Sequence, residues 1–175
     1  MVIFVLFGLF VVFVLLLKKR SLINMMGDHN KFVHKLQNAV WFQNFRLAGL
    51  LLFLLNGALF LLTALILYLF TYLFIPFVHL FIMIFAVLAS FYLWIIFNKA
   101  WQGSNRERLK VGAIGSSFYG ILGLLFIYWL MTLKPLYPGD DSFMRAFGLY
   151  AGILVTTVAF FSSFIITGFT NRKEL

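Results

Sequence analysis

The residues best suited to chemistry in this chain are one histidine and two aspartates. His79 lies shortly after Pro76, and Asp140 and Asp141 belong to a later loop that we expect on the same side of a membrane. A histidine beside a carboxylate can bind a metal ion or move a proton. More often such a histidine anchors a protein at headgroup level, and the Pro-Gly-Asp-Asp-Ser stretch at 138–142 is typical of a turn followed by a helix cap. We therefore expect no metal site.

Other catalytic patterns lack the groups that they need. The serines inside the apolar segments have no base at a similar depth, which an intramembrane nucleophile requires. His29 and His34 are expected across the bilayer from His79, so a bis-histidine haem site is not expected. The chain has no cysteine, which excludes disulfides, thiolate metal sites and Fe–S clusters, and it contains no HExxH or Walker motif. The sequence predicts no enzyme and no cofactor.

Composition points to a membrane protein. Hydrophobic residues make up 63% of the chain and charged residues 11%, against roughly 45–50% and about 25% in a soluble domain. A globule of 175 residues has too little interior to bury 24 phenylalanines and their aliphatic neighbours. The surrounding solvent is therefore expected to be lipid, which excludes a soluble domain and a nucleic-acid-binding module.

Hydropathy predicts the elements that would position any site. A helix needs about 20 apolar residues to cross a core about 30 Å thick. We predict an all-α, polytopic bundle of five transmembrane helices, forming a single membrane domain over 1–175. The first segment has its charges after the apolar run, which favours an uncleaved anchor over a signal peptide, although cleavage or incomplete crossing stays open. Pro76 predicts a tight hairpin between the second and third spans. The five spans are 2–17, 47–75, 77–97, 113–133 and 147–169.

The distribution of positive charge predicts the orientation. Twelve of the fourteen Lys and Arg residues fall on one side of these spans, and only Lys134 and Arg145 fall on the other. Cytoplasmic loops are enriched in Lys and Arg, so we expect the N-terminus outside and the C-terminus in the cytoplasm. The net charge of +9 then reflects contact with anionic headgroups rather than a nucleic-acid partner. The composition favours a bacterial plasma membrane.

The segment 21–46 between the first two spans has apolar residues at three- and four-residue spacing and cations between them. This pattern predicts an amphipathic helix that lies in the cytoplasmic interface, and docking on a partner is the alternative. The loop that follows the third span is expected to be a solvated connector with a flexible tip at 102–105. Aromatic residues are expected in two belts at headgroup level. The outer belt includes Tyr68, Tyr128, Trp129 and Tyr150, and the inner belt Tyr92, Trp94 and Trp101.

Two features predict helix packing. Asn56 lies in the middle of the second span, where a buried amide must find a partner, so we expect it to lock helices together rather than to line a polar path. Small residues recur every three or four positions on the last two spans, and small side chains let helices approach closely. These faces are expected to pack on each other or on a partner. They comprise Gly112, Ser116 and Gly120 on one span and Gly148, Gly152, Thr156, Ala159 and Ser163 on the other.

Two classes of function follow. The favoured one is a non-enzymatic accessory or regulatory subunit that acts by helix–helix contact with partner membrane proteins. The alternative is a small permease or channel for an uncharged or weakly polar solute, working as a homo-oligomer. No Asp, Glu, Lys or Arg lies within an expected span, which argues against an ion or proton pathway and favours the first class.

Overall fold

The computed structural model describes residues 12–14, 16–18, 21, 31–72, 78–135 and 142–169, and the regular elements in these ranges are all helices. The all-α prediction is thereby confirmed for the described part of the chain. In chain order the elements are α3 (Lys31–Gln37), the 3-10 helix η1 (Val40–Gln43), α4 (Phe45–Tyr72), α5 (Val78–Ala100), α6 (Asn105–Met131) and α7 (Phe143–Gly168).

Four of these helices, α4 to α7, are long and apolar enough to cross a membrane. Their lengths of 23 to 28 residues correspond to about 35–42 Å at 1.5 Å per residue, more than the core thickness of about 30 Å. They match the last four predicted spans. Most of the first predicted span, 2–17, lies outside the described residues.

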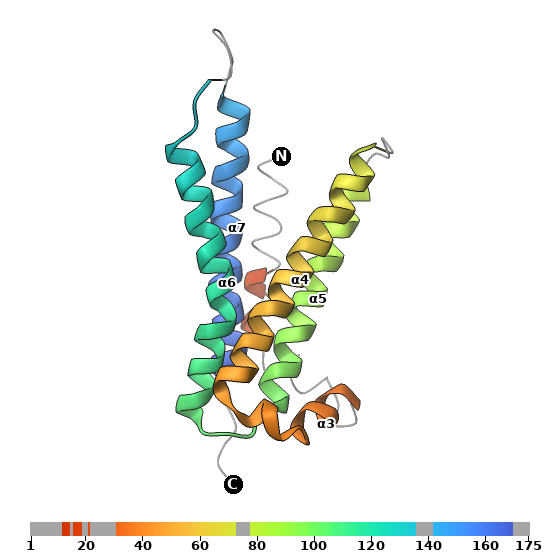
Figure 1. Cartoon of the computed structure of the whole chain (residues 1–175). Helices are drawn as coiled ribbons and strands as arrows, with labels where there is room; N and C mark the ends of the chain where they lie inside the picture. The colour runs from red at the N-terminus through yellow and green to blue at the C-terminus, as the bar shows by residue number, and fades with distance from the viewer. Residues whose placement is uncertain are drawn as a thin grey trace.

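The four long helices form two antiparallel hairpins that meet at one end (Figure 1). The α6–α7 hairpin packs along its length, whereas the α4–α5 hairpin touches it near α3 and leans away toward the other end. The predicted hairpin at Pro76 is confirmed in the pairing of α4 with α5, although the turn at 73–77 lies outside the described residues.

The first turn of α6 begins eight residues before the predicted span. Ser104 is its N-cap: its hydroxyl accepts a hydrogen bond from the backbone N–H of Glu107 at 3.3 Å. The Ser104 hydroxyl also donates to a Glu107 carboxylate oxygen at 3.1 Å, so the two side chains of the Ser-x-x-Glu pattern are joined directly. The prediction of a flexible connector tip at 102–105 is therefore wrong for Asn105, which is the first residue of α6. Hydropathy did not indicate this start because the first turn of the helix is polar.

The segment that precedes α4 does not continue as one helix. The helix α3 ends at Gln37, and η1 follows after a two-residue break. Val33 of α3 is buried against the bundle while Phe32 is exposed. Residues 22–30, where the predicted amphipathic helix would begin, lie outside the described residues.

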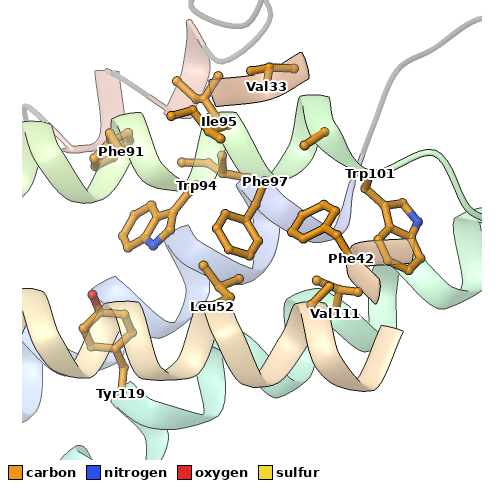
Figure 2. Packing of buried hydrophobic residues seen from close by; sticks show 14 residues of the cluster. Val33, Phe42, Leu52, Phe91, Trp94, Ile95, Phe97, Trp101, Val111 and Tyr119 are labelled. Carbon is orange, nitrogen blue, oxygen red and sulfur yellow. The ribbon is translucent and has the colours of Figure 1, made fainter. Parts of the chain in front are cut away.

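An aromatic core fills the end of the bundle where the two hairpins meet (Figure 2). Phe42 of η1 packs edge-on against Phe97 of α5 and against Trp101, which directly follows α5, with ring centroids 5.3 and 6.3 Å apart. Trp94 and Trp101 are only 2% and 1% exposed. Their assignment to an inner belt at the headgroups is therefore wrong: an amphipathic ring can be buried in protein as well as at an interface when its N–H finds a partner.

Candidate functional site

The main polar cluster within the described helices is centred on Asn56, which is fully buried where α4, α5 and α6 meet. The Asn56 Nδ2 group donates to the carbonyl oxygen of Gly115 on α6 at 3.0 Å. Its Oδ1 atom accepts from Trp94 Nε1 on α5 at 3.0 Å. The Tyr119 hydroxyl lies 3.5 Å from the same oxygen, beyond the usual range for a strong O–H···O bond. One side chain thus connects three helices. We name Asn56, Trp94, Gly115 and Tyr119 the Asn56 cluster.

Glycines allow α4 and α6 to come close enough for these hydrogen bonds. A Cβ atom added to Gly115 would lie 2.2 Å from Leu52 Cδ2, and one added to Gly49 would lie 2.8 Å from Ile114 Cβ. Such distances are far below van der Waals contact, so neither position has room for a side chain. Glycine at both positions therefore lets the two helix backbones approach each other closely. The backbone carbonyl of Gly115 is accessible to the Asn56 amide for this reason.

A second buried amide connects α5 to the end of α7. Asn98 Nδ2 donates to the carbonyl oxygens of Ile166 at 2.7 Å and of Phe169 at 3.2 Å. The last carbonyls of a helix have no partner within the helix, and burying them without one is costly. Asn98 therefore acts as a C-cap in trans, and it fixes the end of α7 against α5.

The small residues predicted for packing lie along the α6–α7 contact, with one exception. A Cβ atom added to Gly112 would lie 3.0 Å from Thr167 Oγ1, and one added to Gly152 would lie 3.0 Å from Phe126. The other members of this face that are at least partly buried are Ser116, Gly120, Thr156, Ala159 and Ser163. The exception is Gly148, whose added Cβ would have no heavy atom within 4 Å.

Two serines on α7 have no hydrogen-bond partner for the side chain. The hydroxyl oxygens of Ser162 and Ser163 are both buried and unbonded. They lie near the end of α7 that Asn98 caps, among apolar neighbours such as Ile166. Among the described residues, neither hydroxyl is hydrogen-bonded to a base such as a nucleophilic serine needs.

The predicted outer group of His79, Asp140 and Asp141 is only partly described. His79 is exposed in the first turn of α5, at the end of the hairpin that leans away from α6 and α7 (Figure 1). The two aspartates lie outside the described residues. The cap of α7 was predicted at Asp141 or Ser142; Ser142 is at the N-cap position but its side chain makes no capping hydrogen bond, and Asp141 lies outside the described residues. Within the described ranges, no three His, Asp or Glu residues lie close enough together to hold a metal ion.

Sequence reasoning missed the residues of α5, and the one directly after it, that complete these contacts. Phe91, Trp94 and Asn98 of α5 and the following Trp101 recur at spacings of three, four and three residues and are all buried. This is the period of one helix face. The signal was present in the sequence, but it is difficult to detect in a segment where nearly every residue is apolar.

These polar groups mainly bond one another or backbone carbonyls, and the arrangement can hold helices in register without performing a reaction. Comparison of the chain with protein-family models, with curated proteins and with solved structures finds no match.

Proposed function

We propose that this protein is a non-enzymatic accessory or regulatory membrane subunit, which acts by helix–helix contact with partner membrane proteins. In this proposal five helices cross the plasma membrane of a bacterium, the N-terminus is outside, and the segment 21–46 lies in the cytoplasmic interface as an amphipathic element. The described helices α4 to α7 provide the last four spans.

The observation that carries this proposal is that the buried amides of the bundle serve internal packing. Asn56 is 0% exposed, and both ends of its amide have hydrogen-bond partners within 3.0 Å. Asn98 is occupied with the last carbonyls of α7. A permease for a polar solute would instead present such groups to a water-filled path. This argues against the alternative of a solute path through Asn56.

The surface best placed for a partner is the outer part of the α4–α5 hairpin, which leans away from the rest of the bundle (Figure 1). Phe81 and Phe85 of α5 are 72% and 75% exposed, and they lie four residues apart on one helix face. Leu61 and Leu65 of α4 are exposed in the same way. Since α6 and α7 use their small-residue face on each other, the proposal assigns the contact with another membrane helix to these exposed side chains of α4 and α5.

The test is a pull-down of tagged protein from a mild detergent, followed by mass analysis of the proteins that co-purify. We expect a stoichiometric membrane partner, whose recovery falls in the Phe81→Ala/Phe85→Ala variant. The matched control is Phe161→Ala, because Phe161 is an exposed phenylalanine on α7.

A homogeneous homo-oligomer without a partner would contradict the proposal. It would favour the permease or channel instead, and flux into proteoliposomes would then be measured for the wild type and for Asn56→Leu. Equal recovery of the partner in all variants would contradict the assignment of the contact to α5.

A further inference from the structure

Two cations from different helices converge on one aromatic ring at the end of the bundle where α4 and α6 both begin (Figure 1). Lys110 Nζ of α6 lies 4.9 Å from the centroid of the Phe45 ring, and Arg46 Cζ of α4 lies 5.7 Å from the same centroid. Arg106 precedes Lys110 by four residues, so it lies on the same face of α6. The three cations are exposed and the ring is half-buried. We name Phe45, Arg46, Arg106 and Lys110 the Phe45 site.

The ring holds these cations without neutralising them. A cation–π contact leaves the full positive charge on Lys and Arg, and two like charges beside one ring repel each other. Arg46 and Arg106 also lie in the first turns of α4 and α6, where the helix dipole disfavours a cation. Glu107 is the single acidic residue within the described ranges, and its carboxylate accepts a hydrogen bond from Ser104 at 3.1 Å. A bound anion would relieve the repulsion within the Phe45 site.

The positive charge of this end does not depend on the residues outside the described ranges. Lys31 and Lys35 of α3 are exposed at the same end as the three cations of the Phe45 site (Figure 1). The whole chain has five acidic residues, and two of them, at 140–141, directly precede the helix α7, which begins at the opposite end. The acidic residues that remain are fewer than these exposed cations. This end is therefore positively charged wherever the other residues lie.

An apolar seam between α4 and α6 continues from the Phe45 site toward the middle of the two helices. Ile114 and Phe118 follow Lys110 at intervals of four residues on α6. Phe118 packs against Phe53 and Phe60 of α4, with ring centroids 5.6 and 5.9 Å apart. These side chains are half-buried, so one side of the seam is open to the surroundings of the helices. An acyl chain whose headgroup lies at the Phe45 site can follow this seam.

The lengths of the two helices place the Phe45 site at the level of the lipid headgroups. The helices α4 and α6 contain 28 and 27 residues, about 42 and 40 Å, so each extends about 5 Å beyond either face of a hydrocarbon core about 30 Å thick. The Phe45 site occupies the first two turns of these helices. Long Lys and Arg side chains in such a position extend their charges into the headgroup layer, while the seam lies in the hydrocarbon.

We propose that the Phe45 site binds the phosphate group of an anionic phospholipid, one acyl chain of which lies along the seam between α4 and α6. Arg46, Arg106 and Lys110 donate charge-assisted hydrogen bonds to the phosphate oxygens. The ligand is a phospholipid rather than a soluble phosphate ester because the cations continue into an apolar seam. This site does not rest on the proposed function, since the partner surface at Phe81 and Phe85 lies toward the other end of the bundle (Figure 1).

The first experiment measures lipid binding to the delipidated full chain in a mild detergent. The protein is titrated with phosphatidylglycerol or with phosphatidylcholine of the same acyl chains, and the bound lipids are counted by native mass spectrometry. We expect one molecule of phosphatidylglycerol to bind about tenfold or more tightly than phosphatidylcholine, because only the first has a net negative charge for the three cations. Equal affinity for the two lipids would overturn the proposal.

A charge-matched pair of variants distinguishes a site from general attraction to a basic surface. Arg46→Gln/Lys110→Gln should raise the Kd for phosphatidylglycerol by about tenfold or more, because it removes two charge-assisted contacts. The control Lys31→Gln/Lys35→Gln removes the same formal charge from exposed positions on α3 at the same end and should change the Kd by less than about twofold. Equal weakening in both variants would mean that total charge attracts the lipid, and it would overturn the proposal. Thermal stability and elution volume are compared for all variants to detect a folding defect.

The position and the source of the phosphate are tested on the wild type, so this result does not depend on the folding of any variant. Phosphatidylglycerol with a photoreactive diazirine on its headgroup should label residues in 44–47 and 106–110. Labelling spread evenly over the exposed residues of this end would overturn the proposal. Glycerol 3-phosphate should fail to displace the labelled lipid, and displacement as effective as that by unlabelled phosphatidylglycerol would assign the site to a soluble ester instead.

Discussion

Replacement of Asn56 by leucine tests the structural role of the Asn56 cluster. The change keeps the side-chain size similar and removes the bonds to Gly115 and Trp94, both 3.0 Å long. Hydrogen bonds between membrane helices contribute about 0.6 to 1.7 kcal/mol each, so Asn56→Leu should lower the free energy of unfolding by about 1 to 3.5 kcal/mol. The contact with Tyr119, at 3.5 Å, adds little to this value because of its length.

The free energy of unfolding would be measured in bicelles by steric trapping. Thr63→Val is the matched control on the same helix, because the Thr63 hydroxyl donates to the carbonyl oxygen of Leu59 within α4 at 2.7 Å and joins no other helix. A double-mutant cycle with Trp94→Phe isolates the indole–amide bond, since phenylalanine keeps an aromatic ring but lacks the N–H. We expect a coupling energy of about 0.6 to 1.7 kcal/mol.

Two results would refute this reasoning. One is a loss in Asn56→Leu no larger than that in Thr63→Val. The other is a coupling energy close to zero, which would mean that the Asn56 amide and the Trp94 indole are not bonded. A loss of transport with unchanged stability would identify Asn56 as part of a solute path and contradict the packing role.

Three further changes test the helix contacts. Gly115→Ala places a Cβ atom 2.2 Å from Leu52 Cδ2 and should lower the free energy of unfolding by about 1 to 3 kcal/mol. The double variant Gly115→Ala/Leu52→Ala should lose less stability than the sum of the two single losses, because the smaller side chain removes the clash. Strictly additive losses would contradict the clash. Asn98→Leu removes the cap of α7 and should speed hydrogen exchange in its last turn, while unchanged exchange there would exclude the capping role. Ser163→Ala removes a buried, unbonded hydroxyl, so stability should stay equal or rise by up to about 1 kcal/mol; a clear loss would mean that this hydroxyl has a partner.

Hydropathy was sufficient to predict the four long helices and the pairing of α4 with α5. Long apolar runs need helical backbone hydrogen bonds in a membrane, and Pro76 interrupts the longest run, so both features follow from local sequence. The ends were less accurate: α6 begins at Asn105 because Ser104 caps it. A polar first turn has no hydropathy signal, although the Ser-x-x-Glu pattern was readable.

The packing role of Asn56 and the small-residue face of α6 and α7 was also expected from the sequence, but their partners were not. Asn56 could have met any neighbouring helix, and only the fold brings Trp94 and the Gly115 carbonyl to it. The hydropathy of Trp94 and Trp101 is compatible with either headgroups or protein interior, and the tertiary structure buries both.

The sequence by itself determined that the chain forms long helices apolar enough to cross a membrane. That follows from the free energy of transfer of each residue into lipid, which depends on the residue and its neighbours along the chain. Only the tertiary structure decided which helix faces meet and that the two hairpins join at one end. Lipid and the protein interior are similarly apolar, so hydropathy cannot distinguish them, and the choice depends on the fit of side chains from distant parts of the sequence.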